Sequence, residues 1–205
     1  ATEKMIQKTE SEPRLGGSSG RRFILWGEQT SQVYEEIDIH CTMHDGKPLF
    51  AAKRDGKWFA VWGDLESQKY DYVRSPSVYG GKLLFKATHK GKWFVVLGDQ
   101  EGEVYDSVSS LSVHDGKLLF AAKRRKTFVV WGKQTSRRYD EVYCCSIHEG
   151  KPLFIAESNE KRYVVWGKYE SDVYNSCSKL KSNEDGFTFI ANKNGQYYEV
   201  IVKTK

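Results

Sequence analysis

Residues 75–98 read SPSVYGGKLLFKATHKGKWFVVLG, and this stretch decides the fold. Its last seven residues, KWFVVLG, recur along the chain at intervals of about 35 residues. The other copies are RRFILWG at 21–27, KWFAVWG at 57–63, KTFVVWG at 126–132, KRYVVWG at 161–167 and a divergent QYYEVIV at 196–202. Tyrosine, phenylalanine and alanine follow the same period. Because several residue types share one period, the sequence predicts a repeat architecture.

Each repeat divides into four short strands, which we name A to D in chain order. Strand A ends at a turn such as Asp115-Gly116, a pair that favours a tight hairpin. Strand B follows as KLLFAAK at 117–123, and strand C is the aromatic run that ends at Trp-Gly. Strand D carries the tyrosine, as in RRYDEV at 137–142. Four strands in this length leave only hairpin-sized connections, so we expect an antiparallel meander.

One sheet of this size cannot bury both of its faces, so neighbouring copies must stack. Strands B and C are apolar on both faces, which fits a sheet held between two others. Every copy has an alanine two residues after the strand-B phenylalanine, where a small side chain lets another sheet approach. These residues are Ala52, Ala87, Ala122, Ala156 and Ala191. Radial stacking hides most strand edges, so the sequence predicts an all-β propeller closed into a ring.

The number of blades follows from the copies of strand C. Six copies favour six four-stranded blades, with five as the alternative, because the segment EPRLGGSSG at 12–20 has two interpretations. It is either a degenerate strand A–B region or a Gly/Ser linker. We therefore divide the chain into residues 1–20, a tail or degenerate blade segment, and residues 21–205, a single propeller domain.

The repeat resembles those of TolB-like and WD-like β-propellers, and residues 75–98 carry the resemblance best. It covers about residues 31–203, and a weaker resemblance is to WG-repeat proteins. The resemblance implies a propeller fold but no particular activity, because such propellers include binding modules, scaffolds and enzyme domains. It also implies a periplasmic or secreted location. The four cysteines lack paired metal-ligand spacing and are expected to be free thiols, which favours a reducing compartment instead.

Composition excludes several classes of protein. No apolar run approaches the roughly 20 residues that span a bilayer, and the polar start ATEKMIQKTE does not read as a signal peptide. No hydrolase, kinase, nucleotide-binding or zinc-protease motif is present, so we predict neither catalytic residues nor a cofactor. The net charge of +5 is modest, and we expect a monomer.

Three histidines, His44, His114 and His148, share the position just before the A–B turn. Three such side chains are weak candidates for a metal site, and the favoured interpretation is that they are polar turn residues. The repeated Tyr-Asp pairs suit backbone hydrogen bonding better than acid–base catalysis, which needs two carboxyl groups held close together. The repeated tryptophans are assigned to packing between blades, with sugar stacking as the alternative.

Charge gives the one functional asymmetry. The propeller topology places the B–C hairpins and the D–A connections at one face, where cations outnumber acids. The candidate binding residues are Lys53, Arg54, Lys57, Lys90, Lys92, Lys123, Arg124, Arg125 and Lys126. The run from Lys123 to Lys126 is the densest patch, in a hairpin that lacks the usual glycine. Such a face raises the encounter rate with anionic partners.

The sequence therefore predicts a non-catalytic binding or scaffold module that recognises an acidic protein or another polyanion through the B–C hairpins. Two alternatives stay open. One is a repeat lectin that binds carbohydrate between blades, and the other is a propeller enzyme that uses a metal or carboxylates. Nucleic acid is disfavoured, because no exposed aromatic residues alternate with the basic ones.

Overall fold

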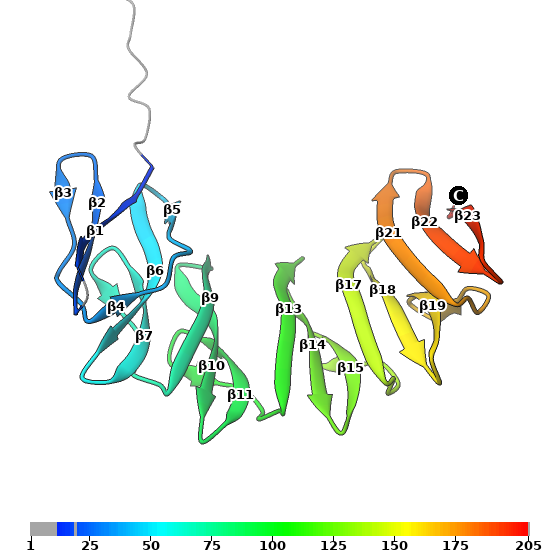
Figure 1. Cartoon of the computed structure of the whole chain (residues 1–205), viewed down its shortest axis with the longest axis horizontal. Coiled ribbons are helices and arrows are strands. Elements are labelled where there is room, and N and C mark those ends of the chain that lie inside the picture. Colours follow the sequence, from blue (N-terminus) through cyan, green and yellow to red (C-terminus); the bar gives the residue numbers. More distant parts are fainter. Residues whose placement is uncertain (1–11, 19, 205) are drawn as a thin grey trace, which may run out of the picture. The chain divides into compact units, whose positions relative to one another are not determined.

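The computed structural model describes residues 12–18 and 20–204, and everything below concerns these residues. They form six antiparallel sheets in chain order and contain no helix, which confirms the predicted all-β class and the count of six. Accordingly, none of them forms a helix that could cross a membrane. The chain divides into two compact units, Ala1–Val104 and Tyr105–Lys205, and each is described by itself (Figure 1).

The first unit holds sheets 1 to 3. Sheet 1 contains β1 (Arg14–Ser18), β2 (Arg21–Trp26) and β3 (Gln29–Thr30). Sheet 2 contains β4 (Glu36–Ile37), β5 (Thr42–His44), β6 (Lys47–Arg54), β7 (Lys57–Trp62) and β8 (Leu65–Glu66). Sheet 3 contains β9 (Tyr72–Tyr79), β10 (Lys82–His89), β11 (Lys92–Leu97) and β12 (Gln100–Glu101).

The second unit holds sheets 4 to 6. Sheet 4 contains β13 (Ser107–His114), β14 (Lys117–Arg124), β15 (Lys126–Trp131) and β16 (Gln134–Thr135). Sheet 5 contains β17 (Glu141–His148), β18 (Lys151–Ser158), β19 (Lys161–Trp166) and β20 (Tyr169–Glu170). Sheet 6 contains β21 (Ser176–Asn183), β22 (Gly186–Lys193) and β23 (Gln196–Lys203).

Strand D differs from the prediction. Its tyrosine ends the outer edge of one sheet, where Tyr70 pairs with Trp58 and Tyr139 with Thr127. The two residues after it lead into strand A of the following sheet, so the predicted strand RRYDEV spans two sheets. Strand A is consequently longer than predicted. It runs through a bulge at one residue with positive φ, namely Ser75, Ser110, Cys144 or Lys179.

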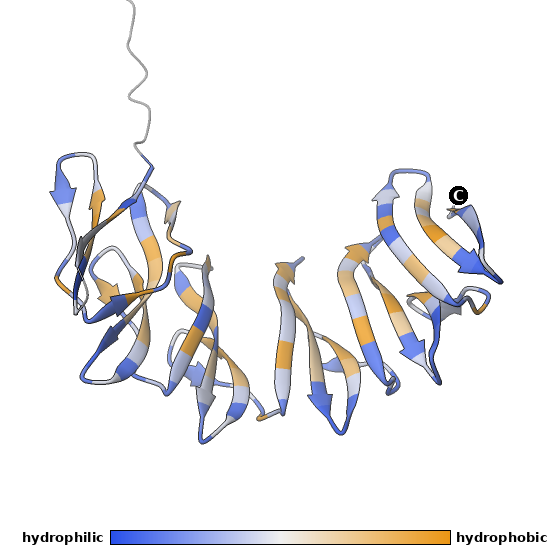
Figure 2. Cartoon of the chain, viewed as in Figure 1, coloured by the Kyte–Doolittle hydropathy of each residue, from blue (hydrophilic) through white to orange (hydrophobic). Residues whose placement is uncertain are grey.

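Consecutive sheets within a unit pack face to face through the apolar bands of strands B and C (Figure 2). The strand-D tyrosine closes each contact, because the rings of Tyr34, Tyr70 and Tyr139 each meet two rings of the next sheet. The ring of Tyr174 meets Phe189 in the same way. Tyr70, for example, lies 5.7 Å from Phe85 and 5.6 Å from Phe94 between ring centroids. The predicted alanines are at most 1 % exposed, and Ala52 packs in one cluster with Ile24 of the preceding sheet. Such aromatic packing and burial are the main stabilising terms of the fold.

The first and last sheets each lack one strand among the described residues. β1 pairs with β2 in the register of a strand B, so residues 14–18 belong to sheet 1, which has no strand A. The sequence predicted a tail or degenerate segment over residues 1–20. Of this segment, residues 1–11 and 19 lie outside the described part. Sheet 6 has strands A, B and C but no strand D.

Candidate basic hollow at the B–C turn of sheet 4

The B–C turns are held by a carboxylate or amide from the D–A connection that precedes each sheet. Asp71 accepts hydrogen bonds from the backbone N–H of Lys90, at 2.7 Å, and from the ammonium of Lys57, at 2.5 Å. Asp140 accepts from the backbone N–H of Asn159 at 2.8 Å, and Glu35 and Asn175 make the matching bonds in sheets 2 and 6. The repeated acidic position is therefore structural, as the sequence predicted.

These bonds lower the pKa of both aspartates. The ammonium of Lys57 and the N–H of Lys90 hold the pKa of Asp71 below its usual value. The N–H of Asn159 and the ammonium of Lys126 do the same for the pKa of Asp140. Both carboxylates therefore stay charged near neutral pH and stabilise their turns.

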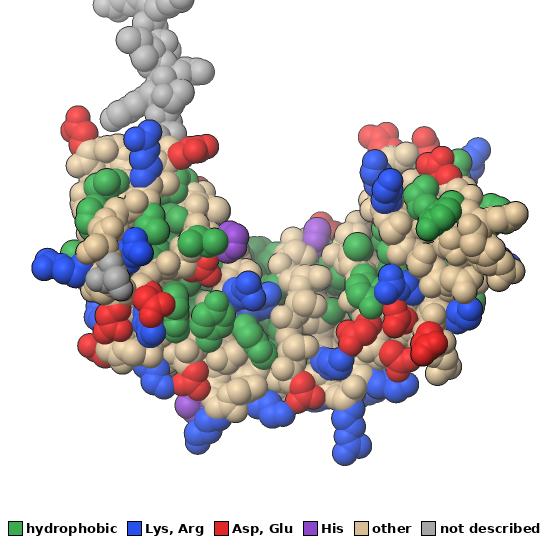
Figure 3. Space-filling view, viewed as in Figure 1, with side chains coloured by type: hydrophobic (Ala, Val, Ile, Leu, Met, Phe, Trp, Pro, Cys, Tyr) green, Lys and Arg blue, Asp and Glu red, His purple; other side chains and the backbone are tan. Residues whose placement is uncertain are grey.

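The same carboxylates reduce the predicted basic character of the turn ends. The sequence count placed them in strand D, whereas the structure places them beside the B–C turns. Lysine and arginine side chains gather with acidic ones at these ends in both units (Figure 3). The excess of positive charge is therefore smaller than the sequence indicated.

In sheet 2 the predicted cations are largely neutralised. Lys53 pairs with Glu36 at 2.6 Å, which raises the pKa of the lysine, and Lys57 pairs with Asp71. Arg54 forms a bidentate pair with Glu66, at 2.9 and 3.0 Å, and stacks over Tyr34 and Phe59. In sheet 3, Lys90 and Lys92 are exposed on either side of Gly91.

Sheet 4 differs, because its B–C turn borders an open hollow of about 470 Å³ lined by four cationic residues. They are Arg124, Arg125, Lys126 and Arg138. Lys126 is 3.1 Å from Asp140, and the guanidinium of Arg124 lies over the ring of Tyr105 at 4.7 Å. The fourth predicted cation of this run, Lys123, pairs instead with Glu141. No carboxylate among the described residues pairs with the guanidinium of Arg125 or of Arg138.

Sequence reasoning did not identify Arg138. The residue precedes the strand-D tyrosine, and the bridge between Thr127 and Tyr139 brings it beside the turn. There its guanidinium donates to the carbonyl of Arg124 at 3.2 Å and stacks over Phe128 at 5.0 Å. The sequence does show Arg138, as the second arginine of RRYDEV. Its position beside the B–C turn could be predicted only from the register between strands C and D.

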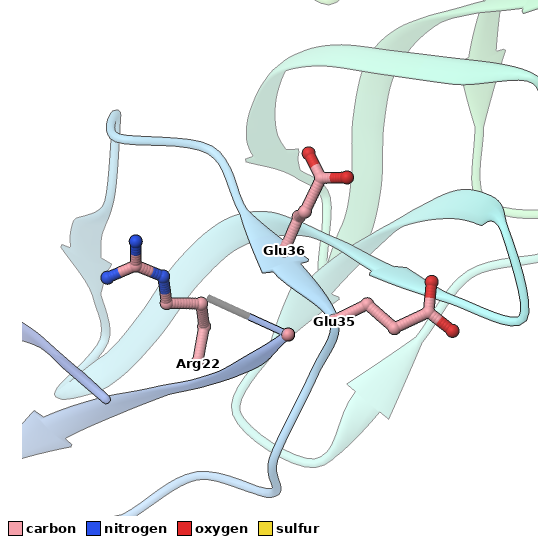
Figure 4. A pocket seen from close by; sticks show the side chains of 4 residues that line it. Arg22, Glu35 and Glu36 are labelled. Atoms are coloured by element: carbon pink, nitrogen blue, oxygen red, sulfur yellow. The ribbon is translucent and has the colours of Figure 1, made fainter. Parts of the chain in front are cut away.

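A second hollow, of about 380 Å³, lies at the matching end of sheet 1 and has mixed charge. Gly20, Arg22, Glu35 and Glu36 line it. Arg22 and Glu36 extend in the same general direction, while Glu35 turns away toward the B–C turn of sheet 2 (Figure 4). With two carboxylates and one guanidinium, this hollow does not select strongly for anions.

The histidines singled out as weak metal candidates pack against the repeated tryptophans. His44 meets Trp62 at 5.5 Å and His148 meets Trp166 at 5.5 Å between ring centroids. The indole N–H of each tryptophan donates to the backbone carbonyl of that histidine, at 3.0 and 2.9 Å. His114 contacts Ser112. Within residues 12–18 and 20–204, no three His, Cys, Asp or Glu side chains form a group that could hold a metal ion.

The four cysteines are free thiols in the structure. Burial raises the pKa of Cys145 to about 12 and that of Cys177 to about 11. These two thiols are therefore poor nucleophiles at neutral pH, as expected of small packing residues.

No family model matches the chain, and no curated protein matches it either. The TolB-like and WG-repeat resemblances therefore stay predictions. Among solved structures, the chain is similar to the computationally designed Ika8 protein, with 13% identity and a TM-score of 0.51 over 95% of this chain and 72% of that one.

Two propellers are also among the similar structures. The β-propeller domain of the Trilobed protease from Pyrococcus furiosus has 13% identity and a TM-score of 0.47, covering 96% of this chain and 83% of that one. The WD40 β-propeller domain of Doa1 has 14% identity and a TM-score of 0.41, covering 95% and 76%. At 13% identity, the likeness to the designed Ika8 protein concerns the fold alone.

The fold is that of a β-propeller. Its six sheets are the blades, and the order of strands A to D within them is the one that the repeat predicted. Because this fold supports many functions, the function has to be argued from the side chains.

Proposed function

We propose that the chain is a non-catalytic binding module that holds an acidic segment of a partner protein in the basic hollow of sheet 4. The observation that carries this proposal is the lining of the hollow. Four cationic side chains converge there, and the guanidiniums of Arg125 and Arg138 have no carboxylate partner among the described residues. A planar guanidinium binds a carboxylate through two parallel N–H donors, which suits aspartate and glutamate side chains.

The turn itself distinguishes sheet 4 by charge and not by backbone strain. β14 and β15 are joined by the single exposed residue Arg125, which has a φ of 63°. The B–C turns of sheets 2, 3 and 5 also hold non-glycine residues with positive φ, namely Asp55, Lys90 and Glu160. The arginine side chain at this point is therefore the feature that sets the sheet 4 turn apart.

The competing functions have less support. The strand-C tryptophans that a lectin would expose are covered, because Lys47 lies 5.5 Å and Lys151 4.3 Å from the ring centroids of Trp62 and Trp166. The repeated aspartates that an enzyme would use are hydrogen-bonded to backbone N–H groups. No observation therefore favours either alternative.

A charge-reversal experiment tests the proposal. The probe is a fluorescein-labelled peptide of seven glutamates, and its affinity is measured by fluorescence anisotropy at low and high salt. We expect R125E/R138E to weaken binding at least tenfold and to flatten its salt dependence, because two unpaired cations are replaced by anions.

The matched control is K133E/K168E. It makes the same change in net charge at two exposed lysines in the C–D turns, at the other end of sheets 4 and 5. We expect this variant to lose less than threefold in affinity. An equal loss in both variants, or no loss in R125E/R138E, would contradict the proposed site.

A further inference from the structure

Among the described residues, a strand D covers the outer edge of strand C in sheets 1 to 5, and in four of these sheets a serine makes the same two hydrogen bonds. In sheet 5, the N–H of Ser171 donates to the carbonyl of Val164 at 2.9 Å, and its hydroxyl accepts from the N–H of Val164 at 2.9 Å. Three residues later, Tyr174 exchanges two backbone hydrogen bonds with Arg162, at 2.9 and 2.8 Å.

Sheets 1, 2 and 4 repeat this pattern with Ser31, Ser67 and Ser136, at distances of 2.8 to 2.9 Å. Each serine precedes its tyrosine by three residues. Two of the segments also have an apolar residue two positions before the serine, Leu65 in LESQKY and Tyr169 in YESDVY. These four segments therefore show which extended sequence pairs with the outer edge of a strand C.

β23 is the strand C of sheet 6, and within the second unit no described strand pairs with its outer edge. The shared register with β22 places Tyr197, Glu199 and Ile201 at the positions of Arg162, Val164 and Trp166. In sheet 5 these positions direct their N–H and carbonyl groups toward strand D. β23 thus presents the same backbone groups, and no described strand of the second unit lies against them.

The side chains along this edge are also exposed. Tyr197 is 76 % and Ile201 65 % accessible, although both are large apolar groups. Exposed apolar side chains beside an unpaired strand edge are the features by which one chain adds a strand to the sheet of another.

We propose that the outer edge of β23 binds an extended peptide segment of a partner protein, with a serine three residues before a tyrosine and an apolar residue two positions before that serine. The serine bonds with the backbone of Glu199, the tyrosine pairs with Tyr197, and the apolar residue covers Ile201. This edge lies in sheet 6, away from the basic hollow of sheet 4, so the inference does not depend on the proposed function.

The probe for this edge is a capped, fluorescein-labelled LESQKY hexapeptide, a copy of residues 65–70, which carries one acidic and one basic side chain. We expect saturable binding to the full chain in fluorescence anisotropy. A peptide with alanine in place of the serine should bind at least fivefold more weakly, because the acceptor for the N–H of Glu199 is lost.

Three variants test the location of the site. Glu199→Pro removes the outward N–H and leaves the ladder with β22 in place, because proline is tolerated where the N–H of an edge strand faces solvent. We expect it to weaken binding at least tenfold, whereas Glu199→Ala, which keeps the N–H, should change the affinity less than threefold. Circular dichroism checks that both variants fold. The third variant, Y197S/I201S, alters only exposed side chains and should weaken binding at least fivefold.

Three results would overturn the inference. The first is no binding at about 1 mM protein, and the second is binding that neither Y197S/I201S nor a folded Glu199→Pro weakens. The third is a dimer in sedimentation, without peptide, that Glu199→Pro dissociates, because the occupant would then be a second copy of this chain. The variant R125E/R138E should bind LESQKY as the wild type does, so failure of one proposal is distinguishable from failure of the other.

Discussion

The B–C turns of sheets 2 and 4 occupy the same place in their repeats, but their turn residues Asp55 and Arg125 carry opposite charge. In sheet 2, Asp55 pairs with Lys69 at 2.5 Å, and this pairing lowers the pKa of Asp55. In sheet 4, Arg125 replaces the Asp55-Gly56 pair, and Arg138 stands where sheet 2 has Lys69. One turn neutralises its cation, whereas the other adds a second cation. The comparison shows how a repeated scaffold can specialise at one turn while its core is unchanged.

The largest expected effect concerns that shared core. Tyr70→Ala and Tyr139→Ala each remove a ring that is at most 5 % exposed and that contacts two rings of the next sheet. We expect each substitution to lower the free energy of unfolding by about 3–5 kcal/mol, as for other buried aromatic truncations. Chemical denaturation measures this loss. A loss below about 1 kcal/mol in either variant would show that the two regions do not share their packing.

Arg125→Gly separates strain from charge at the sheet 4 turn. Glycine adopts the φ of 63° without steric cost, so we expect stability to rise by about 0.5–1 kcal/mol. The same change removes a cation from the hollow and should weaken glutamate-peptide binding severalfold. Denaturation and anisotropy on one preparation measure both quantities. A loss of stability together with unchanged binding would contradict the assigned role of Arg125.

Asp55→Arg converts the sheet 2 turn toward the sheet 4 pattern. This substitution removes the ion pair between Asp55 and Lys69 and places two cations side by side. We expect a second, weaker site for the glutamate peptide, because Arg54 stays engaged with Glu66 and Gln32. Isothermal titration calorimetry reports the change in stoichiometry. Unchanged stoichiometry would mean that the hollow needs more than two adjacent cations.

The smallest expected effect is the pH dependence of stability, which should be similar for the aspartates that hold the B–C turns in both units. Asp71 and Asp140 have lowered pKa values in the folded state, so each stabilises the fold above the unfolded-state pKa of about 4. This stabilisation is lost as the pH falls through the folded-state pKa. We therefore expect Asp71→Asn and Asp140→Asn to lower the unfolding temperature at pH 6, with the difference from wild type shrinking toward pH 2. A difference that is constant with pH would exclude the ionic contribution.

Much of the fold could be predicted from the sequence, because one period recurs in several residue types. The six strands C, the buried alanines and the tyrosine at the outer edge all follow from that period and from the need to bury both faces of each sheet. The sequence left two interpretations of residues 14–18 open, a degenerate strand or a linker, because RLGGS keeps only one apolar side chain, Leu15. Its place in sheet 1 is visible only through its backbone pairing with β2.

The site was predicted in part. The run from Lys123 to Lys126 was found as a charge patch, and three of its residues line the hollow. Arg138 and the capping role of Asp140 were missed for one reason. Both depend on where strand D leaves one sheet and strand A of the next begins, and a bulge in strand A sets that point. A bulge shifts register without changing the spacing of the repeat, so periodicity does not show it.

Gly102 is the one exception to the serine pattern of strand D, and it sits in sheet 3. Its N–H still donates to the carbonyl of Val95 at 2.8 Å, but it offers no hydroxyl to the N–H of Val95. Among the described strands C that are covered by a strand D, only β11 lacks that acceptor, at Val95. The amide proton of Val95 should therefore exchange with deuterium faster than those of Ala60 and Val129, whose N–H groups donate to a serine hydroxyl. We expect the contact between strands C and D to open more readily in sheet 3 than in sheets 2 and 4.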